Sequence, residues 1–116
     1  MNTKKLEYFL KDIKLYQENT IESRTSSCKR IERIYGDLDY HYKKNKCKLI
    51  IGDLSKSLNE FSTHVHKIEI STKADYVNVT RTLLNSIELY RDCITYFDQV
   101  PTLEEILSQD EDFLAE

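Results

Sequence analysis

Residues 46–70 read KCKLIIGDLSKSLNEFSTHVHKIEI, and residues 73–99 read KADYVNVTRTLLNSIELYRDCITYFDQ. In the first stretch the apolar residues recur alternately every four and every three positions: Cys47, Ile51, Leu54, Leu58, Phe61, Val65 and Ile68. This spacing places them on one face of a helix, so it predicts a helix over about 46–70. A short strand over 47–51 is the alternative, because a brief apolar run fits either structure.

The second stretch carries a similar stripe: Tyr76, Val79 or Thr80, Leu83, Ile87, Tyr90, Ile94 and Phe97. It predicts a helix over about 73–99, with Thr72 and Asp75 resembling a capping box at its start. The helix should stop at Val100, because the residue before a proline avoids the α region.

Residues 102–108 begin with a second capping box, Thr102 with Glu105, which predicts a short terminal helix. The remaining residues 109–116 are acidic, and we expect them to be frayed.

The first 45 residues carry two further apolar faces. One consists of Leu6, Phe9, Leu10, Ile13 and Tyr16, and the other of Cys28, Ile31, Tyr35, Leu38 and Tyr42. The polar residues 19–27 separate them. One long and kinked helix is favoured, since neither Gly nor Pro forces a stop, and a break near 22–27 is the alternative. Gly36 lies within the second face, where it either permits a close helix approach or is simply tolerated.

Glycine and proline are scarce, with two Gly and one Pro in 116 residues. Tight β-turns need such residues, so their scarcity favours a few long elements. We therefore predict an all-α fold: an up-down bundle of three long or four shorter helices, plus the short terminal helix. Residues 1–108 would form one domain, and 109–116 an acidic, flexible tail.

Charge is distributed unevenly along the chain. Residues 1–50 hold 12 Lys/Arg and 7 Asp/Glu, whereas residues 51–116 hold 5 and 13. The two halves either fold against each other or face different partners. The three cysteines are far apart and odd in number, so we expect reduced thiols on buried or half-buried residues and a cytoplasmic location. No apolar run is long enough to span a membrane, so no membrane partner is expected.

The pattern of reactive side chains does not favour catalysis. His64 and His66 lie two positions apart, so on a helix they diverge by about 200° and cannot share a metal ion. The chain has no G-x-S-x-G sequence and no glycine-rich loop for a phosphate or an oxyanion. Arg33 and His41 are too far apart for the arginine–histidine pair of some helical ribonucleases. We expect no enzymatic activity, no metal and no cofactor.

Binding to another protein is the favoured function, as for small inhibitors, immunity-type proteins or assembly subunits. Eight tyrosines are an excess, and tyrosine is enriched in binding hot spots. The candidate partner-binding residues are those outside the predicted core stripes and those of the acidic tail: Tyr8, Tyr40, Tyr96, Asp110, Glu111, Asp112 and Phe113.

Nucleic-acid binding is the first alternative, through the basic N-terminal half. Phosphate-binding cations and aromatic rings are combined there. The residues concerned are Lys29, Arg30, Arg33, Lys43, Lys44, Lys46 and Lys48. Lysines at the end of a helix are also expected from the helix dipole alone, and the chain as a whole is acidic. Self-association into a homo-oligomer is the second alternative, because stripes this regular can pair between chains.

Overall fold

The elements of the fold are helical throughout the part of the chain that is described. The structure is a computed structural model, and it describes residues 1–60, 63–71 and 73–99. In chain order the elements are α1 (Thr3–Tyr8), the π-helical turn η1 (Phe9–Ile13), α2 (Glu18–Tyr35), α3 (Leu38–Asn45), α4 (Lys48–Asn59) and α5 (Lys73–Gln99). No strand occurs in these ranges, so the predicted all-α class is confirmed.

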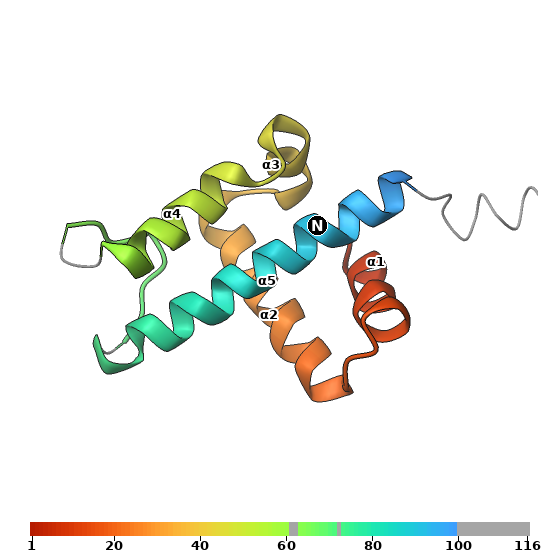
Figure 1. Cartoon of the computed structure of the whole chain (residues 1–116), viewed down its shortest axis with the longest axis horizontal. Coiled ribbons are helices and arrows are strands. Elements are labelled where there is room, and N and C mark those ends of the chain that lie inside the picture. Colours follow the sequence, from red (N-terminus) through yellow and green to blue (C-terminus); the bar gives the residue numbers. More distant parts are fainter. Residues whose placement is uncertain (61–62, 72, 100–116) are drawn as a thin grey trace, which may run out of the picture.

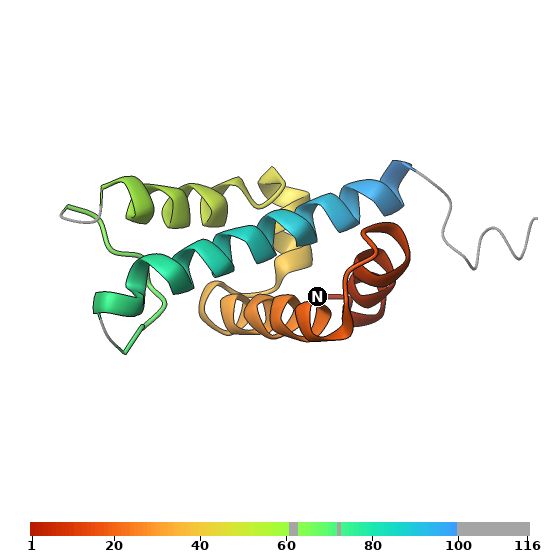
Figure 2. The same cartoon turned by 60° about the horizontal axis from the view of Figure 1, so that its bottom comes forward.

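Helix α5 is the longest element and the centre of the fold (Figure 1). It packs against both α2 and α4, and Figure 2 shows it running between them. Its bounds match the predicted helix over 73–99, and its buried face carries the predicted residues Tyr76, Thr80, Leu83, Ile87 and Tyr90. The apolar periodicity therefore identifies both the central helix and its inward face correctly.

Tyr90 joins three elements at one point of the core. Its side chain is fully buried, and its hydroxyl donates a hydrogen bond to Asp39 in α3. The same hydroxyl accepts a hydrogen bond of 3.1 Å from the backbone N–H of Asn2, the N-cap residue of α1. Burial and the Asp39 carboxylate raise the pKa of Tyr90 above its usual range, so the hydroxyl keeps its proton. One side chain thus holds α1, α3 and α5 together.

The N-terminal segment does not form the predicted long helix. The helical part that starts at Thr3 ends at Ile13, and α2 begins at Glu18. The chain turns at Leu15, which has a φ of 58°, and the N–H of Tyr16 bonds to the carbonyl of Leu10. The alternative of a break near 22–27 is also wrong, because those residues lie inside α2. The polar composition of 19–27 reflects an exposed helix face more than an interruption.

Gly36 ends α2 and divides the second predicted face. Its φ is 93°, a conformation open mainly to glycine, and its N–H bonds to the carbonyl of Glu32. Asp37 then caps α3 by accepting a hydrogen bond from the backbone N–H of Asp39. The residues Cys28, Ile31, Leu38 and Tyr42 are buried as predicted, but on two helices. Gly36 therefore makes a turn, and both roles predicted for it inside a helix are wrong.

The predicted helix over 46–70 is about half as long as expected. Helix α4 ends at Asn59, and residues 63–71 follow an irregular path. Val65, a member of the predicted stripe, is 64% exposed, whereas the adjacent His66 is buried. The short strand over 47–51 is also wrong, because residues 48–51 belong to α4. The apolar spacing continues past the point at which the helix stops.

Four predicted features lie outside the described residues. These are Thr72 of the first capping box, the stop at Val100 and Pro101, the helix over 102–108 and the acidic residues 109–116. None of the helices in the described part of the chain combines the length and the apolar character that crossing a membrane requires.

Candidate functional site

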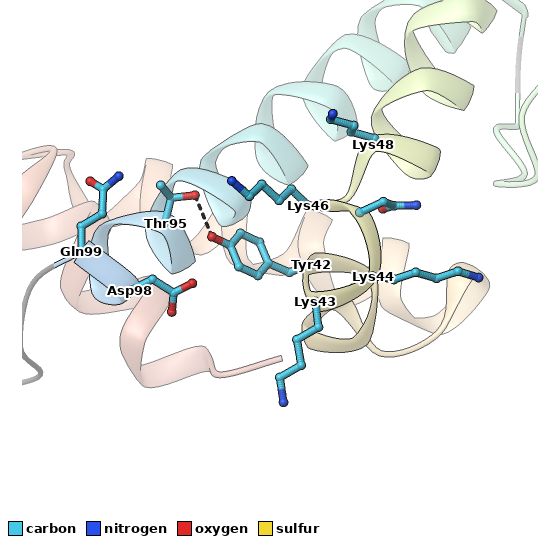
Figure 3. A pocket seen from close by; sticks show the side chains of 9 residues that line it. Tyr42, Lys43, Lys44, Lys46, Lys48, Thr95, Asp98 and Gln99 are labelled. Carbon is cyan, nitrogen blue, oxygen red and sulfur yellow. Dashed lines mark hydrogen bonds between the residues drawn. The ribbon is translucent and has the colours of Figure 1, made fainter.

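A groove lined by lysines lies where the chain passes from α3 to α4, beside the last turns of α5 (Figure 3). It has a volume of about 810 Å³. Two segments far apart in sequence form its walls: Tyr42, Lys43, Lys44, Asn45, Lys46 and Lys48 on one side, and Thr95, Asp98 and Gln99 on the other. We call this feature the lysine groove.

The turn between α3 and α4 gives the lysine groove its shape. Lys46 and Cys47 both have left-handed backbone conformations, with φ of 55° and 62°. Their N–H groups donate to the carbonyls of Tyr42 and His41, which satisfies the end of α3. Cys47 is fully buried, so the core holds this turn in place and leaves Lys46 exposed at the groove.

The wall of the groove is fixed by a hydrogen bond between α3 and α5. The Tyr42 hydroxyl lies 3.0 Å from Thr95 Oγ1, and Thr95 Oγ1 donates to the carbonyl of Arg91 at 2.8 Å. Because a hydroxyl has one proton, Tyr42 is the donor to Thr95. Tyr42 is only 8% exposed, so its ring belongs to the core.

The electrostatic character of the groove is positive and largely uncompensated. All four of its lysines are exposed, and within the described ranges none forms an ion pair with an acidic side chain. Lys44 lies over the ring of Tyr40, 5.8 Å from its centre. Figure 3 shows Lys46 extending toward α5, whereas Lys44 points away from it. Among the described residues, Asp98 is the one acidic residue on the wall.

The other basic residues of the predicted nucleic-acid set lie on α2 and do not line the groove. Lys29 and Arg33 are exposed there. Arg30 is half-buried, and its guanidinium donates to the carbonyl of Glu69 at 2.5 Å. The structure therefore gathers Lys43, Lys44, Lys46 and Lys48 around one groove and leaves the three residues of α2 apart from it.

The three tyrosines predicted to bind a partner do not share one surface. Tyr8 and Tyr96 belong to an aromatic cluster at the end of α5, in which Phe97 lies 6.0 Å from Tyr8 and 5.3 Å from Tyr96, centre to centre. Tyr40 is 57% exposed and lies on α3, close to the lysine groove. Asp110, Glu111, Asp112 and Phe113 lie outside the described residues.

His64 and His66 play different parts in the segment 63–71. His64 Nε2 lies 2.5 Å from Asp53 Oδ1, and Tyr35 donates to the other oxygen of Asp53. His66 is buried against Tyr76, with its Nε2 2.7 Å from Thr80 Oγ1 and its Nδ1 accepting from the N–H of Ile68. Burial lowers the pKa of His66, so the ring is neutral and Nε2 carries its proton. Both rings fasten the segment to the helices.

The cysteines are poorly suited to nucleophilic chemistry. All three are free and fully buried. Burial raises the pKa of Cys28 to about 12, of Cys47 to about 11 and of Cys93 to about 12. The thiolate is the reactive form of cysteine, and it is scarce at neutral pH in such surroundings. Across the described residues, no group of three or more His, Cys, Asp or Glu side chains is arranged to hold a metal ion.

Sequence reasoning identified the four lysines but missed the groove. The groove depends on the left-handed turn at Lys46 and Cys47 and on the return of α5 to that turn. In the sequence, Asn45 could have indicated the end of α3 and the turn that follows it, because asparagine is common where a helix ends in a left-handed turn. The positions of Thr95, Asp98 and Gln99 follow only from the tertiary packing.

Comparison of the chain with protein-family models, with curated proteins and with solved structures finds no match. The assignment of a function therefore rests on the groove and on the chemistry of its residues.

Proposed function

We propose that the chain is a non-enzymatic binding protein whose lysine groove holds an acidic segment of another protein. The observation that supports this proposal is the gathering of four exposed lysines around one groove, none of them paired with an acidic side chain in the described part of the chain. Ammonium groups without counter-charges attract carboxylates, and the shared field speeds the encounter of oppositely charged partners.

The walls of the groove suit a peptide better than a bare anion. Asn45, Thr95 and Gln99 add neutral hydrogen-bonding side chains to the lysines. Asp98 on the opposite wall would repel a carboxylate placed beside it, so it favours one register of a bound segment. Each exposed lysine–carboxylate pair contributes about 0.2–1 kcal/mol, so several pairs are needed for useful affinity.

Two observations make nucleic acid the weaker candidate. Tyr42 is buried and its hydroxyl is bonded to Thr95, so its ring offers no face to a base. Lys44 lies over the ring of Tyr40, the exposed tyrosine nearest the lysines. Single-stranded nucleic acids are bound by stacking of bases on free aromatic rings together with phosphate contacts. Here the ring of Tyr42 is buried and the ring of Tyr40 is covered by Lys44, so neither ring is free to stack on a base.

The test is the binding of a fluorescein-labelled, Glu-rich synthetic peptide, followed by fluorescence anisotropy at about 50 mM salt, with the Gln version of the peptide as reference. We expect the Glu peptide alone to bind, and the double variant Lys43→Gln with Lys46→Gln to weaken binding about two- to tenfold. Lys4→Gln with Lys29→Gln is the matched control, because both side chains are exposed and neither lines the groove.

The proposal fails if the Glu peptide does not bind, or if the control variant weakens binding as much as the groove variant. Tighter binding of a single-stranded oligonucleotide, with Lys29→Gln and Arg33→Gln as damaging as the groove variant, would establish nucleic-acid binding in its place.

A further inference from the structure

We infer that the acidic segment of this same chain, residues 104–112, occupies the lysine groove and competes there with the partner. The inference rests on the proposed function for the competition, but the contact itself can be tested alone. The acidic segment contains Glu104, Glu105, Asp110, Glu111 and Asp112.

The described helices and the residues after them have opposite net charges. Residues 1–99 hold 17 Lys/Arg and 14 Asp/Glu, whereas residues 100–116 hold six Asp/Glu and no Lys or Arg. Beside the last turns of α5, the lysine groove gathers four lysines that form no ion pair within the described residues. The groove is therefore the natural counterpart for these carboxylates.

The acidic segment is also tethered beside the groove. Gln99, the last described residue, is itself part of the groove wall. A chain spans at most about 3.6 Å per residue, so Glu104 lies within about 18 Å of Gln99 and Asp112 within about 47 Å. A ligand tethered by so short a linker has an effective concentration in the millimolar range, which favours contacts too weak to form between separate molecules.

The composition of the acidic segment suits the groove as well. Ile106 and Leu107 lie between its two groups of acids, and Phe113 and Leu114 come directly after it. Acidic residues interspersed with apolar ones are typical of segments that dock on a basic groove with some apolar lining. The groove offers such lining through the edge of Tyr42 and the aliphatic stems of its lysines.

The contact is tested by zero-length carbodiimide cross-linking of the full chain at high dilution, with mass spectrometry of the monomer. We expect links from Lys43, Lys46 or Lys48 to the acidic segment, and their loss at about 1 M salt. Lys5 is the control for mere proximity, because its Nζ lies 5.4 Å from the ring centre of Phe97 in the same last turn of α5. Links to Lys5 as frequent as links to the groove, or groove links confined to a dimer, would overturn the inference.

The competition is tested in the full chain with its acidic segment neutralised: Glu104→Gln, Glu105→Gln, Asp110→Asn, Glu111→Gln and Asp112→Asn. We expect this variant to bind the Glu-rich peptide about threefold or more tighter than the native chain. The control changes five exposed acids that do not line the groove: Glu7→Gln, Asp12→Asn, Glu18→Gln, Glu22→Gln and Glu69→Gln.

The two proposals fail in different ways. If neutralising the acidic segment leaves peptide binding unchanged, and no cross-links to the groove form, this inference is overturned and the proposed function stands. If cross-links to the groove form in the native chain, but neither the native chain nor the neutralised variant binds the peptide, the proposed function is overturned. The contact within the molecule is then supported.

Discussion

Within the described residues, Leu15, Lys46 and Cys47 hold the left-handed backbone conformation without being glycine. Such a residue costs roughly 1–2 kcal/mol relative to the right-handed region. Cys47 offsets this cost by its burial, but Lys46 is exposed and lines the groove. The left-handed conformation of Lys46 closes the end of α3 and leaves its side chain exposed at the groove.

Lys46→Gly should therefore stabilise the protein and weaken its proposed activity. Glycine adopts a φ of 55° without strain, and we expect the free energy of unfolding in urea to rise by about 0.5–1 kcal/mol. Binding of the Glu-rich peptide should weaken about two- to fivefold, because one ammonium group is lost. Leu15→Gly is the control: it relieves the same strain, at a 79% exposed residue outside the groove, and should leave peptide binding unchanged. A less stable Lys46→Gly variant would contradict this account of the turn.

Gly36→Ala and Gly52→Ala should change stability in opposite directions. An added Cβ meets no atom within 4 Å at either position, so backbone conformation alone decides the outcome. At Gly36, with φ of 93°, alanine is strained, and we expect a loss of about 1–2 kcal/mol in urea unfolding. Gly52 lies within α4, where alanine should add about 0.5–1 kcal/mol. Equal effects of the two substitutions would show that Gly36 is not needed for the turn.

At the scale of the elements, apolar periodicity predicted α5 well and α4 only in part. The stripe of α5 coincides with a continuous helix that packs against α2, α4 and α1. The stripe over 46–70 continues past Asn59, where residues 63–71 are held by side-chain hydrogen bonds instead. Periodicity reports which residues avoid water, and an irregular segment can bury them too, as Ile68 does. The hydrogen bonds from His64 to Asp53 and from His66 to Thr80 join residues 11 and 14 positions apart, so no local pattern predicts them.

The segment 63–71 should make the stability of the fold depend on pH through His66. Its pKa in the folded chain lies below the ordinary value of 6.5 because the ring is buried. The unfolded chain therefore binds a proton first as the pH falls, so stability is full above about 6.5 and is lost as the pH falls through the folded pKa.

We expect urea unfolding to show lower stability at about pH 5 than at about pH 7.5, and the difference to shrink in His66→Gln, which does not titrate there. Carboxylates such as Asp37, whose pKa is lowered by its hydrogen bonds, affect stability only at more acidic pH and serve as the internal reference. An identical pH dependence in the native chain and in His66→Gln would contradict this assignment.

At the scale of the whole molecule, the packing of α5 against α2 and α4 brings its last turns to the end of α3, and the groove is a product of that arrangement. The sequence revealed the all-α class, the central helix and the cluster of lysines. It could not reveal that Thr95, Asp98 and Gln99 stand opposite those lysines, because about fifty residues of folded chain lie between the two walls. The uneven charge along the chain is plain in the sequence, and the structure shows where four of its lysines gather.

The most direct test of the central claim is to locate peptide binding by NMR. Adding the Glu-rich peptide to the ¹⁵N-labelled chain with its acidic segment neutralised should shift the backbone amide signals of residues 42–48 and 95–99. The signals of Lys29 and Arg33 on α2 should stay in place, because these residues lie outside the groove. Shifts confined to α2, or to the aromatic cluster of Tyr8, Tyr96 and Phe97, would contradict the claim that the lysine groove is the binding site.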